Sequence, residues 1–304
     1  MEKITKNLLK GLYRPPKDSH KGQNGKLTIV GGSRLFHGAS LWALKTASRI
    51  VDMVFYATVP ENEELTKKLK SEIYDFIFIP RGKVEDYVEQ SDAILIGPGL
   101  VRGSKKYTGT GETGEETKRL TKRLLDKFPK KKWVIDAGSL QVMDVGWLKR
   151  LENVVITPHL KEFRELFKPK TKNQKPKTQI KNLKTKEQFN NRTIEQWNNM
   201  LLDKAKECGI TIVLKGPTDI ICSTRRCLVN KTGNEGMTKG GTGDVLAGLI
   251  AALACKNKLL LAAAAGTYIN GLAGDRLYKR VGPYFNASDL CDEIPKVMKK
   301  LMEF

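Results

Sequence analysis

The sequence predicts an α/β fold in three layers, with a central, mostly parallel β-sheet flanked by helices. Short apolar runs rich in β-branched residues alternate with amphipathic stretches along the chain. Glycine and small polar residues follow many of these runs. The 304 residues, 40% of them hydrophobic, supply enough material for one large sheet with a buried core.

The apolar runs define the expected strands and the stretches between them the expected helices. Strands are predicted at residues 27–30, 53–59, 76–79, 93–96, 133–136, 154–157, 210–214 and 220–223. Amphipathic helices are predicted at residues 39–51, 61–70 and 115–128, and an apolar helix at 245–255. Strands that alternate with helices pair in parallel and carry helices on both faces.

Two polar stretches look like insertions into this single unit, which covers residues 1–304. Residues 102–116 are rich in glycine and threonine, and residues 168–191 are rich in lysine. Both are expected to form surface loops. No repeat or interdomain linker is evident.

Small and polar residues gather where the predicted strands end. Five such turns are Gly31-Gly32-Ser33, Gly97-Pro98-Gly99, Ala137-Gly138-Ser139, Pro158-His159 and Lys215-Gly216-Pro217. Each alone is an ordinary strand-to-helix turn. Together they favour a binding site, because ligands of open α/β sheets bind at the carboxyl ends of the strands.

The distribution of charge and the length of the apolar runs indicate whether the protein binds nucleic acid or a membrane. The net charge is +21, and much of the excess lies in lysine-rich stretches typical of solvated surfaces. Nucleic-acid binding is not expected, since no zinc finger, helix-turn-helix or RNA-binding motif accompanies the charge. The longest apolar run, residues 245–255, is well short of the ~20 residues that a membrane span needs. No membrane partner is therefore expected.

The five cysteines form no metal-binding or redox pattern. They lie at positions 208, 222, 227, 255 and 291, with no CxxC pair. An odd, unpatterned set predicts buried free thiols in a reducing compartment. The N-terminus lacks the apolar segment of a secretory signal, so a cytoplasmic protein is expected.

The strongest local motif is the glycine-rich block that precedes the helix at residues 245–255. Gly240, Gly241 and Gly243 leave backbone N–H groups free to converge on an anion, and the positive end of the helix dipole points the same way. The motif is neither a Walker A loop nor GxGxxG. It predicts a phosphate-binding site.

Asp244 closes this block and has two interpretations. A carboxylate beside a bound phosphate is well placed to accept a proton from an attacking hydroxyl. Alternatively, Asp244 only caps the helix, since aspartate is a preferred N-cap residue. Capping does not, however, account for the three neighbouring glycines.

The motifs resemble the NAD(P)H-hydrate dehydratases, a family of the ribokinase-like superfamily. Gly-Gly-Thr-Gly-Asp at 240–244 resembles the anion hole and catalytic aspartate of that superfamily. The narrower resemblance runs in order from about residue 19 to 275. It rests on Ser19-His20-Lys21-Gly22, the segment 25–33, His37-Gly38-Ala39, Gly97-Pro98-Gly99-Leu100, Asp136-Ala137-Gly138, Thr157 to Glu162, Val213 to Gly216 and the segment 230–248.

The resemblance implies an enzyme that repairs hydrated NADH or NADPH. Such enzymes phosphorylate the hydroxyl of the hydrate at the expense of ADP or ATP and then eliminate phosphate, with Mg²⁺ as cofactor. Asp244 would be the base and would also contact the substrate. Ala39, Gly99 and His159 would bind the dinucleotide. The residues implied for the nucleotide are Lys215, Gly216, Pro217, Thr218, Asp219, Gly240, Gly241, Thr242 and Gly243.

Some assignments stay open at this point. His159 could simply cap the turn after Pro158, Lys215 could end a strand, and Ala39 could be small for helix packing. Asn234 and Glu235 are candidates for organising Mg²⁺. The choice between ADP and ATP is open, with ADP favoured by the chain's compactness. A homo-oligomer is implied by the resemblance, and a fused epimerase domain is not expected.

The sequence also departs from the family in one place, and two other functions compete. Val101 stands where a further glycine usually follows Gly-Pro-Gly-Leu. The second hypothesis is a ribokinase-like kinase of a small alcohol, such as hydroxymethylpyrimidine or hydroxyethylthiazole, which needs Asp244 but not His159 or Ala39. The third is a protein that binds polyanions without turnover, a function with no use for the Asp244 carboxylate.

Overall fold

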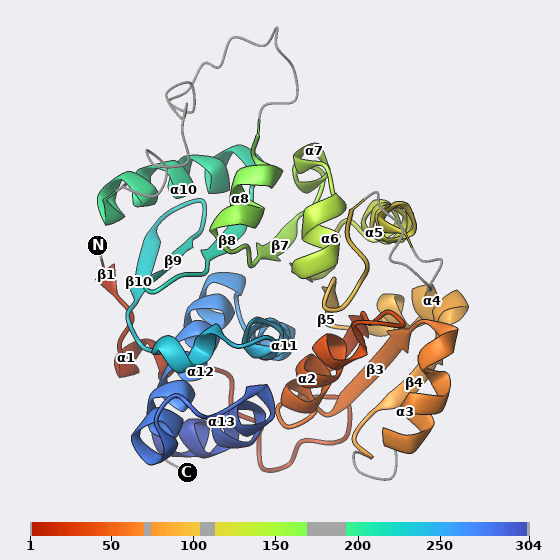
Figure 1. Ribbon diagram of the computed structural model, residues 1–304, viewed down its shortest axis with the longest axis horizontal. Coiled ribbons are helices and arrows are strands. Elements are labelled where there is room, and N and C mark those ends of the chain that lie inside the picture. Colours follow the sequence, from red (N-terminus) through yellow and green to blue (C-terminus); the bar gives the residue numbers. More distant parts are fainter. Residues whose placement is uncertain (1, 70–73, 104–112, 169–192, 303–304) are drawn as a thin grey trace, which may run out of the picture.

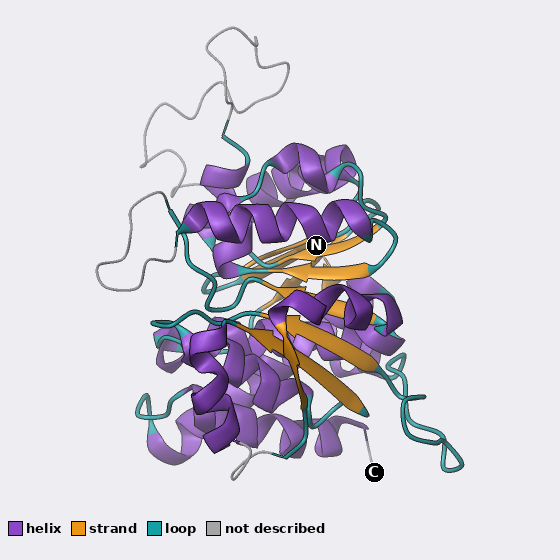
Figure 2. Cartoon of the chain, turned by 90° about the vertical axis from the view of Figure 1, so that its right-hand side faces the viewer, coloured by secondary structure: helices purple, strands orange, loops and turns teal. Residues whose placement is uncertain are grey.

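A single β-sheet runs through the molecule between two layers of helices (Figures 1 and 2). The computed structural model describes residues 2–69, 74–103, 113–168 and 193–302. In this part of the chain the sheet has ten strands in the order β1-β10-β9-β8-β7-β6-β5-β2-β3-β4. The predicted three-layer α/β architecture is confirmed.

The eight predicted strands all form, with ends that differ by at most one residue. They are β2 (Lys26–Val30), β3 (Met53–Thr58), β4 (Ile77–Pro80), β5 (Ala93–Ile96), β6 (Lys132–Ile135), β7 (Asn153–Ile156), β8 (Thr211–Leu214) and β9 (Asp219–Cys222). Two further strands were missed, β1 (Glu2–Lys3) and β10 (Cys227–Asn230). Both are short and lie at one end of the sheet.

The sheet is parallel except around β9. That strand runs antiparallel to both β8 and β10, and β1 pairs in parallel with β10. The carboxyl ends of β2 through β8 therefore meet at one edge, where the predicted turns lie. Strands β5 and β8 are buried along their whole length, and β6 is buried beyond Lys132, as expected for a parallel sheet covered on both faces.

The helices divide between the two faces. One apolar core packs under α1 (Lys6–Leu9), α2 (His37–Ala47), α11 (Thr242–Lys256), α12 (Leu259–Val281) and α13 (Ala287–Met302). The other packs under α4 (Val84–Gln90), α5 (Gly114–Lys127), α6 (Ala137–Val142), α7 (Val145–Leu148), α8 (Leu160–Leu166) and α10 (Ile194–Cys208). Helix α11 lies near the centre of Figure 1 and contacts β5, β6 and β2.

Short helical segments complete the described fold. They are η1 (Pro60–Asn62), α3 (Glu63–Leu69), η2 (Arg81–Lys83) and η4 (Glu235–Thr238). The predicted helices at 39–51, 61–70 and 115–128 correspond to α2, to η1 with α3, and to α5. The helix expected at 245–255 begins earlier, at Thr242.

The two predicted insertions fall largely outside the described residues. Residues 102–116 were predicted to form a loop, but the last three residues of this stretch belong to helix α5, which begins at Gly114. A capping box between Thr113 and Glu116 starts that helix. Of the stretch 168–191, only Lys168 is described. Val101 is buried.

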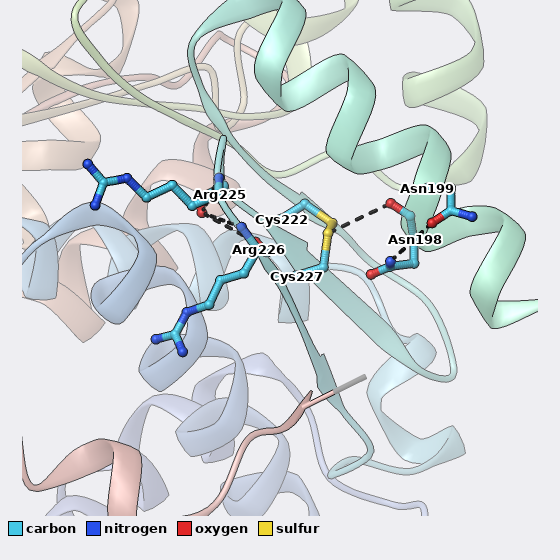
Figure 3. Close-up of a disulfide and its surroundings, with 7 residues drawn as sticks. Asn198, Asn199, Cys222, Arg225, Arg226 and Cys227 are labelled. Carbon is cyan, nitrogen blue, oxygen red and sulfur yellow. Dashed lines mark hydrogen bonds between the residues drawn. A yellow bond between two sulfur atoms is a disulfide. The ribbon is translucent and has the colours of Figure 1, made fainter.

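The cysteine prediction was wrong for one pair. Cys222 and Cys227 form a disulfide, because they lie opposite each other on the antiparallel strands β9 and β10 (Figure 3). Missing β10 meant that this pairing could not be foreseen. Cys208, Cys255 and Cys291 are free and buried, as expected.

Within the described ranges, none of the helices combines the length and the apolar character needed to cross a bilayer.

Candidate active site

The glycine-rich block forms the start of α11. Gly241 is the N-cap of the helix, with φ +96°, and an added Cβ there would lie 2.5 Å from the Trp42 ring. Only glycine fits both the left-handed backbone and this close contact. Asp244 is the third residue of the helix, so the hypothesis that Asp244 is the N-cap is wrong.

The first turn of α11 presents backbone donors to the carboxyl edge of the sheet. Gly243 and Asp244 belong to this turn, whose N–H groups have no acceptor within the helix. Gly240 is exposed, with no atom close to where a side chain would begin. The Thr242 hydroxyl instead donates to the carbonyls of Met237 and Lys239, at 2.7 and 2.9 Å, and so holds the loop closed.

A buried ion pair lies directly beside these donors. Lys215 Nζ is 2.9 Å from Asp136 Oδ1, and the Asp136 side chain is only 3% exposed. A carbon added at Gly243 would be 3.5 Å from the same Nζ. The ammonium group therefore reaches the entrance of the anion-binding turn from β8, while Asp136 reaches it from the end of β6.

Carboxylates outnumber cations around Asp244. Burial raises the pKa of Asp244 to about 7, and the charges of Asp136 and Glu162 add to this effect, while Lys215 opposes it. Burial alone would lower the pKa of Lys215, but the charges of Asp136, Glu162 and Asp244 outweigh it and the pKa is raised. A carboxyl group with a pKa near neutrality is suited to accept a proton at physiological pH.

His159 caps α8, as the structural alternative proposed. Its Nδ1 accepts hydrogen bonds from the backbone N–H groups of Lys161 and Glu162, at 3.1 and 3.2 Å. Glu162 in turn accepts from the His159 N–H at 2.9 Å and from Gln141 Nε2 at 2.7 Å. The His159 side chain is still 48% exposed, so the rest of the ring can meet a ligand.

The segment 215–219 is the tight turn between β8 and β9. Asp219 holds it: Oδ1 accepts from the Gly216 N–H at 3.0 Å, and Oδ2 accepts from Asn230 Nδ2 at 3.1 Å. Burial raises the pKa of Asp219 to about 6. Pro217 is exposed and Thr218 half-buried, so the tip of the turn is open to a ligand.

The residues implied for the dinucleotide lie on the other side of Asp244. Gly99 follows β5 with φ +72°, and an added Cβ would lie 2.1 Å from the Phe36 carbonyl oxygen. The Gly32 N–H donates to the Pro98 carbonyl at 2.8 Å, which joins the turns after β2 and β5. Ala39 is half-buried in the first turn of α2. The two groups of residues implied for the ligands therefore follow different strands, β8 in one case and β2 and β5 in the other.

The candidate metal residues lie elsewhere. Asn234 Nδ2 donates to Asp275 at 3.1 Å and lines a cavity of about 470 Å³ between α12 and α13. Glu235 Oε1 accepts from the Tyr278 hydroxyl at 2.5 Å. Within the described residues, no cluster of three or more His, Cys, Asp or Glu side chains forms a metal site.

The sequence reasoning missed two acidic residues of the pocket. Asp136 and Glu162 belonged to the motifs that carried the resemblance, but neither received a role. The signal was available, since each is a carboxylate at or just after the end of a predicted strand. Ala137 adds another signal, because a non-glycine residue with φ +46° next to Asp136 is uncommon and often found at functional sites.

The fold defines the class first: a ribokinase-like α/β protein, with Asp244 in the first turn of a helix that packs against the central strands of its sheet. The family follows from comparison with known proteins. The family model described as NAD(P)H-hydrate dehydratase matches residues 27–296. The chain belongs to this family.

Curated relatives extend the match to nearly the whole chain. An ADP-dependent (S)-NAD(P)H-hydrate dehydratase of Cenarchaeum symbiosum is 34% identical over 296 residues, covering 93% of this chain and 91% of the relative. A bifunctional NAD(P)H-hydrate repair enzyme Nnr of Methanocaldococcus jannaschii is 34% identical over 299 residues, covering 96% of this chain. The chain spans only 51% of that bifunctional relative.

A solved structure supports the fold. The ADP/ATP-dependent NAD(P)H-hydrate dehydratase from Bacillus subtilis, co-crystallized with ATP and Mg²⁺, superposes with a TM-score of 0.76 and 23% identity. The match covers 99% of this chain and 98% of that one. The alternative of a small-alcohol kinase has less support than the dehydratase family.

Proposed function

We propose that this protein dehydrates hydrated NADH or NADPH back to the reduced cofactor at the expense of an adenine nucleotide. One observation carries the proposal: Asp244, with its pKa raised to about 7, lies at an anion-binding helix start between two subsites. The terminal phosphate of the nucleotide, bound on one side, and the hydroxyl of the hydrate, bound on the other, would meet at this carboxylate.

The first step is phosphoryl transfer to the hydroxyl of the hydrate. Asp244 accepts the hydroxyl proton while the oxygen attacks the terminal phosphorus of the nucleotide, and AMP or ADP leaves. The N–H groups of Gly243 and Asp244, together with the Lys215 ammonium, would stabilise the negative charge on the transferred group.

The second step is elimination. Phosphate leaves the ring carbon with the electron pair of the C–O bond. The neighbouring ring carbon gives its proton to the departing phosphate, and the electron pair of that C–H bond restores the carbon–carbon double bond. Phosphorylation makes this possible, because hydroxide is a poor leaving group and phosphate a good one. Asp136 holds Lys215 in place through both steps.

The donors in the pocket fit a nucleotide that carries Mg²⁺. The ion usually binds through one or two carboxylates, several waters and the substrate phosphates. Asp136 and Glu162, both close enough to raise the pKa of Asp244, offer such carboxylates. When bound, Mg²⁺ would neutralise charge on the phosphates. These residues are better suited than Asn234 and Glu235, whose side chains already bond to α12.

The binding assignments follow the two subsites. Residues 215–219 and 240–243 would hold the nucleotide, and Ala39, Gly99 and the exposed part of His159 the hydrated dinucleotide. We propose ADP as the donor, because the relatives similar along nearly their whole length are named ADP-dependent. We also propose that residues 1–304 act as one unit, in the cytoplasm and as a homo-oligomer.

The test is absorbance at 340 nm with purified protein, Mg²⁺ and hydrated NADH or NADPH, adding ADP or ATP in turn. Recovery of the reduced-nicotinamide absorbance with ADP is the expected result. Nucleotide binding without recovery for either hydrate and either nucleotide would contradict the proposal and favour a small-alcohol kinase.

A further inference from the structure

A second cavity opens beside the dinucleotide subsite, at the ends of β3 and β4. It has a volume of about 710 Å³ and lies between the segments that follow these two strands and helix α5. Its walls combine apolar surface from Val59 and Leu120 with the guanidinium groups of Arg81, Arg119 and Arg123. Its size is within the range of ordinary small-molecule sites.

Arg81 connects this cavity to the glycine turn of the dinucleotide subsite. Its Nη2 donates to the carbonyls of Gly31 and Gly32, at 3.4 and 3.3 Å. Gly32 in turn is bonded to Pro98, one residue before Gly99. The cavity is therefore separated from the dinucleotide subsite by a single backbone turn.

The distance suits the far half of a dinucleotide. Asp136, beside Asp244, ends β6, and the sheet order from there is β6-β5-β2-β3. Three strand spacings amount to roughly 14 Å. A dinucleotide whose nicotinamide end lies at Asp244 and whose body passes Gly99 would bring its adenosine end to this cavity, away from the turn at residues 215–219.

The charged side chains match the adenosine end of a phosphorylated dinucleotide. Arginine binds phosphate through paired hydrogen bonds and is the residue that accommodates a 2′-phosphate in other dinucleotide sites. Among the described residues, Arg119 has no ion-pair partner, whereas Arg123 is bound to Glu85 at 3.2 Å. Glu116, whose Oε2 accepts from the Thr113 N–H at 3.1 Å, offers a carboxylate to a ribose hydroxyl.

We propose that this cavity binds the adenosine 2′-phosphate of hydrated NADPH, with Arg119 as the residue that selects it over hydrated NADH. The inference rests on the proposed function for the position of the nicotinamide end. It deepens that function by naming which of the two hydrates is preferred.

The test compares Arg119→Ala with Lys118→Ala, a neighbouring exposed residue of α5 that does not line the cavity. Loss of a charge-assisted phosphate contact should lower kcat/KM for hydrated NADPH about tenfold more than for hydrated NADH. Lys118→Ala should keep the wild-type ratio. Equal effects of Arg119→Ala on both hydrates would overturn the inference and leave the proposed function intact.

A binding measurement separates the two ideas further. Adenosine 2′,5′-bisphosphate is titrated calorimetrically into protein saturated with ADP, so that the nucleotide subsite is filled. Binding by the wild type that weakens at least tenfold in Arg119→Ala supports the cavity assignment, even if no hydrate is turned over. No binding, or equal binding by both proteins, would overturn it.

Discussion

Two regions of the molecule bury carboxylates among basic side chains, in opposite proportions. At the junction of α12 and α13, the Glu293 side chain is 1% exposed and meets three cations. Arg276 and Arg280 lie 3.1 Å away and Lys296 3.3 Å away. Each cation reaches out to solvent, so the carboxylate is fully neutralised and the two helices are joined.

At the carboxyl edge of the sheet, the ratio is reversed. Among the described residues, Asp136, Glu162 and Asp244 share one ammonium group, that of Lys215, which pairs with Asp136. One carboxylate is left without a full countercharge, and its pKa rises to about 7. An excess of cations produces a structural clamp, whereas an excess of carboxylates produces a group that can exchange protons. This difference distinguishes a functional cluster from a structural one.

The largest expected effect is at Asp244. Asp244→Asn should lower turnover on the order of 10³–10⁴-fold, because the amide cannot accept the hydroxyl proton. The folded protein should persist, since Gly241 and not Asp244 is the N-cap of α11 and asparagine is nearly the same size as aspartate. The measurement is single-turnover recovery of 340 nm absorbance, with circular dichroism as the check on folding. Turnover within tenfold of the wild type would rule out Asp244 as the base.

Removing the single cation should weaken nucleotide use and raise the pKa of Asp244 further. Lys215→Met takes away the one charge that lowers this pKa, so the rising limb of activity should move to a pH above about 7. We also expect kcat/KM for the nucleotide to fall about 100-fold, because a donor to the transferred phosphate is lost. The measurement is a pH profile of kcat/KM. If the rising limb of the pH profile stays at the wild-type pH, Lys215 does not lower the pKa of Asp244.

Removing the Glu293 carboxylate should lower the stability of the fold without changing turnover. Glu293→Ala leaves three cations facing one another and should lower the unfolding free energy by about 2 kcal/mol, less than for a fully buried pair because the cations are partly solvated. Urea denaturation measures the loss. Turnover at 25 °C should match the wild type. A large fall in kcat in a variant that is still folded would show that the Glu293 cluster also serves catalysis and is not purely structural.

The pH dependence of stability should differ between the Asp244 variant and the wild type. Folding raises the pKa of Asp244 from 3.8 to about 7, so the folded protein binds this proton more tightly than the unfolded chain. The group therefore lowers stability as pH rises from about 4 to about 7. Asp244→Asn should remove this decline and raise the unfolding free energy at pH 8 by up to about 4 kcal/mol. Urea denaturation at pH 5 and pH 8 tests this, and parallel changes in both proteins would contradict it.

The smallest expected effect is at His159. His159→Ala removes the cap of α8 and should lower the unfolding free energy by about 1 kcal/mol. KM for the hydrated dinucleotide should rise severalfold while ADP affinity stays near that of the wild type. The readouts are steady-state kinetics and calorimetric titration of ADP. Equal loss of both ligands would mean that His159 does not belong to one subsite.

Local pattern was enough to predict most of the sheet. Strand β5, for example, is a continuous apolar run followed by glycine, so its type and ends follow from the sequence alone. The exact start of α11 was missed because Thr242 and Gly243 are poor helix formers that long-range packing recruits.

The remaining features depend on contacts between distant segments. β10 is only four residues long, and its identity as a strand depends on pairing with β9. The closeness of Asp136 to Lys215 depends on the order of β6, β7 and β8 in the sheet. The cap function of His159 was foreseen as an alternative, but its role in holding Glu162 required the three-dimensional arrangement.

The disulfide between β9 and β10 has a consequence for the turn at residues 215–219, where we propose that the nucleotide binds. In the same ladder, Cys227 faces Cys222 and Asn230 faces Asp219. A slip of one residue along this ladder would turn every side chain of β10 to the opposite side of the sheet, and Asn230 would lose Asp219. The covalent bond forbids that slip, so it fixes the strand register in which Asp219 holds the turn at residues 215–219.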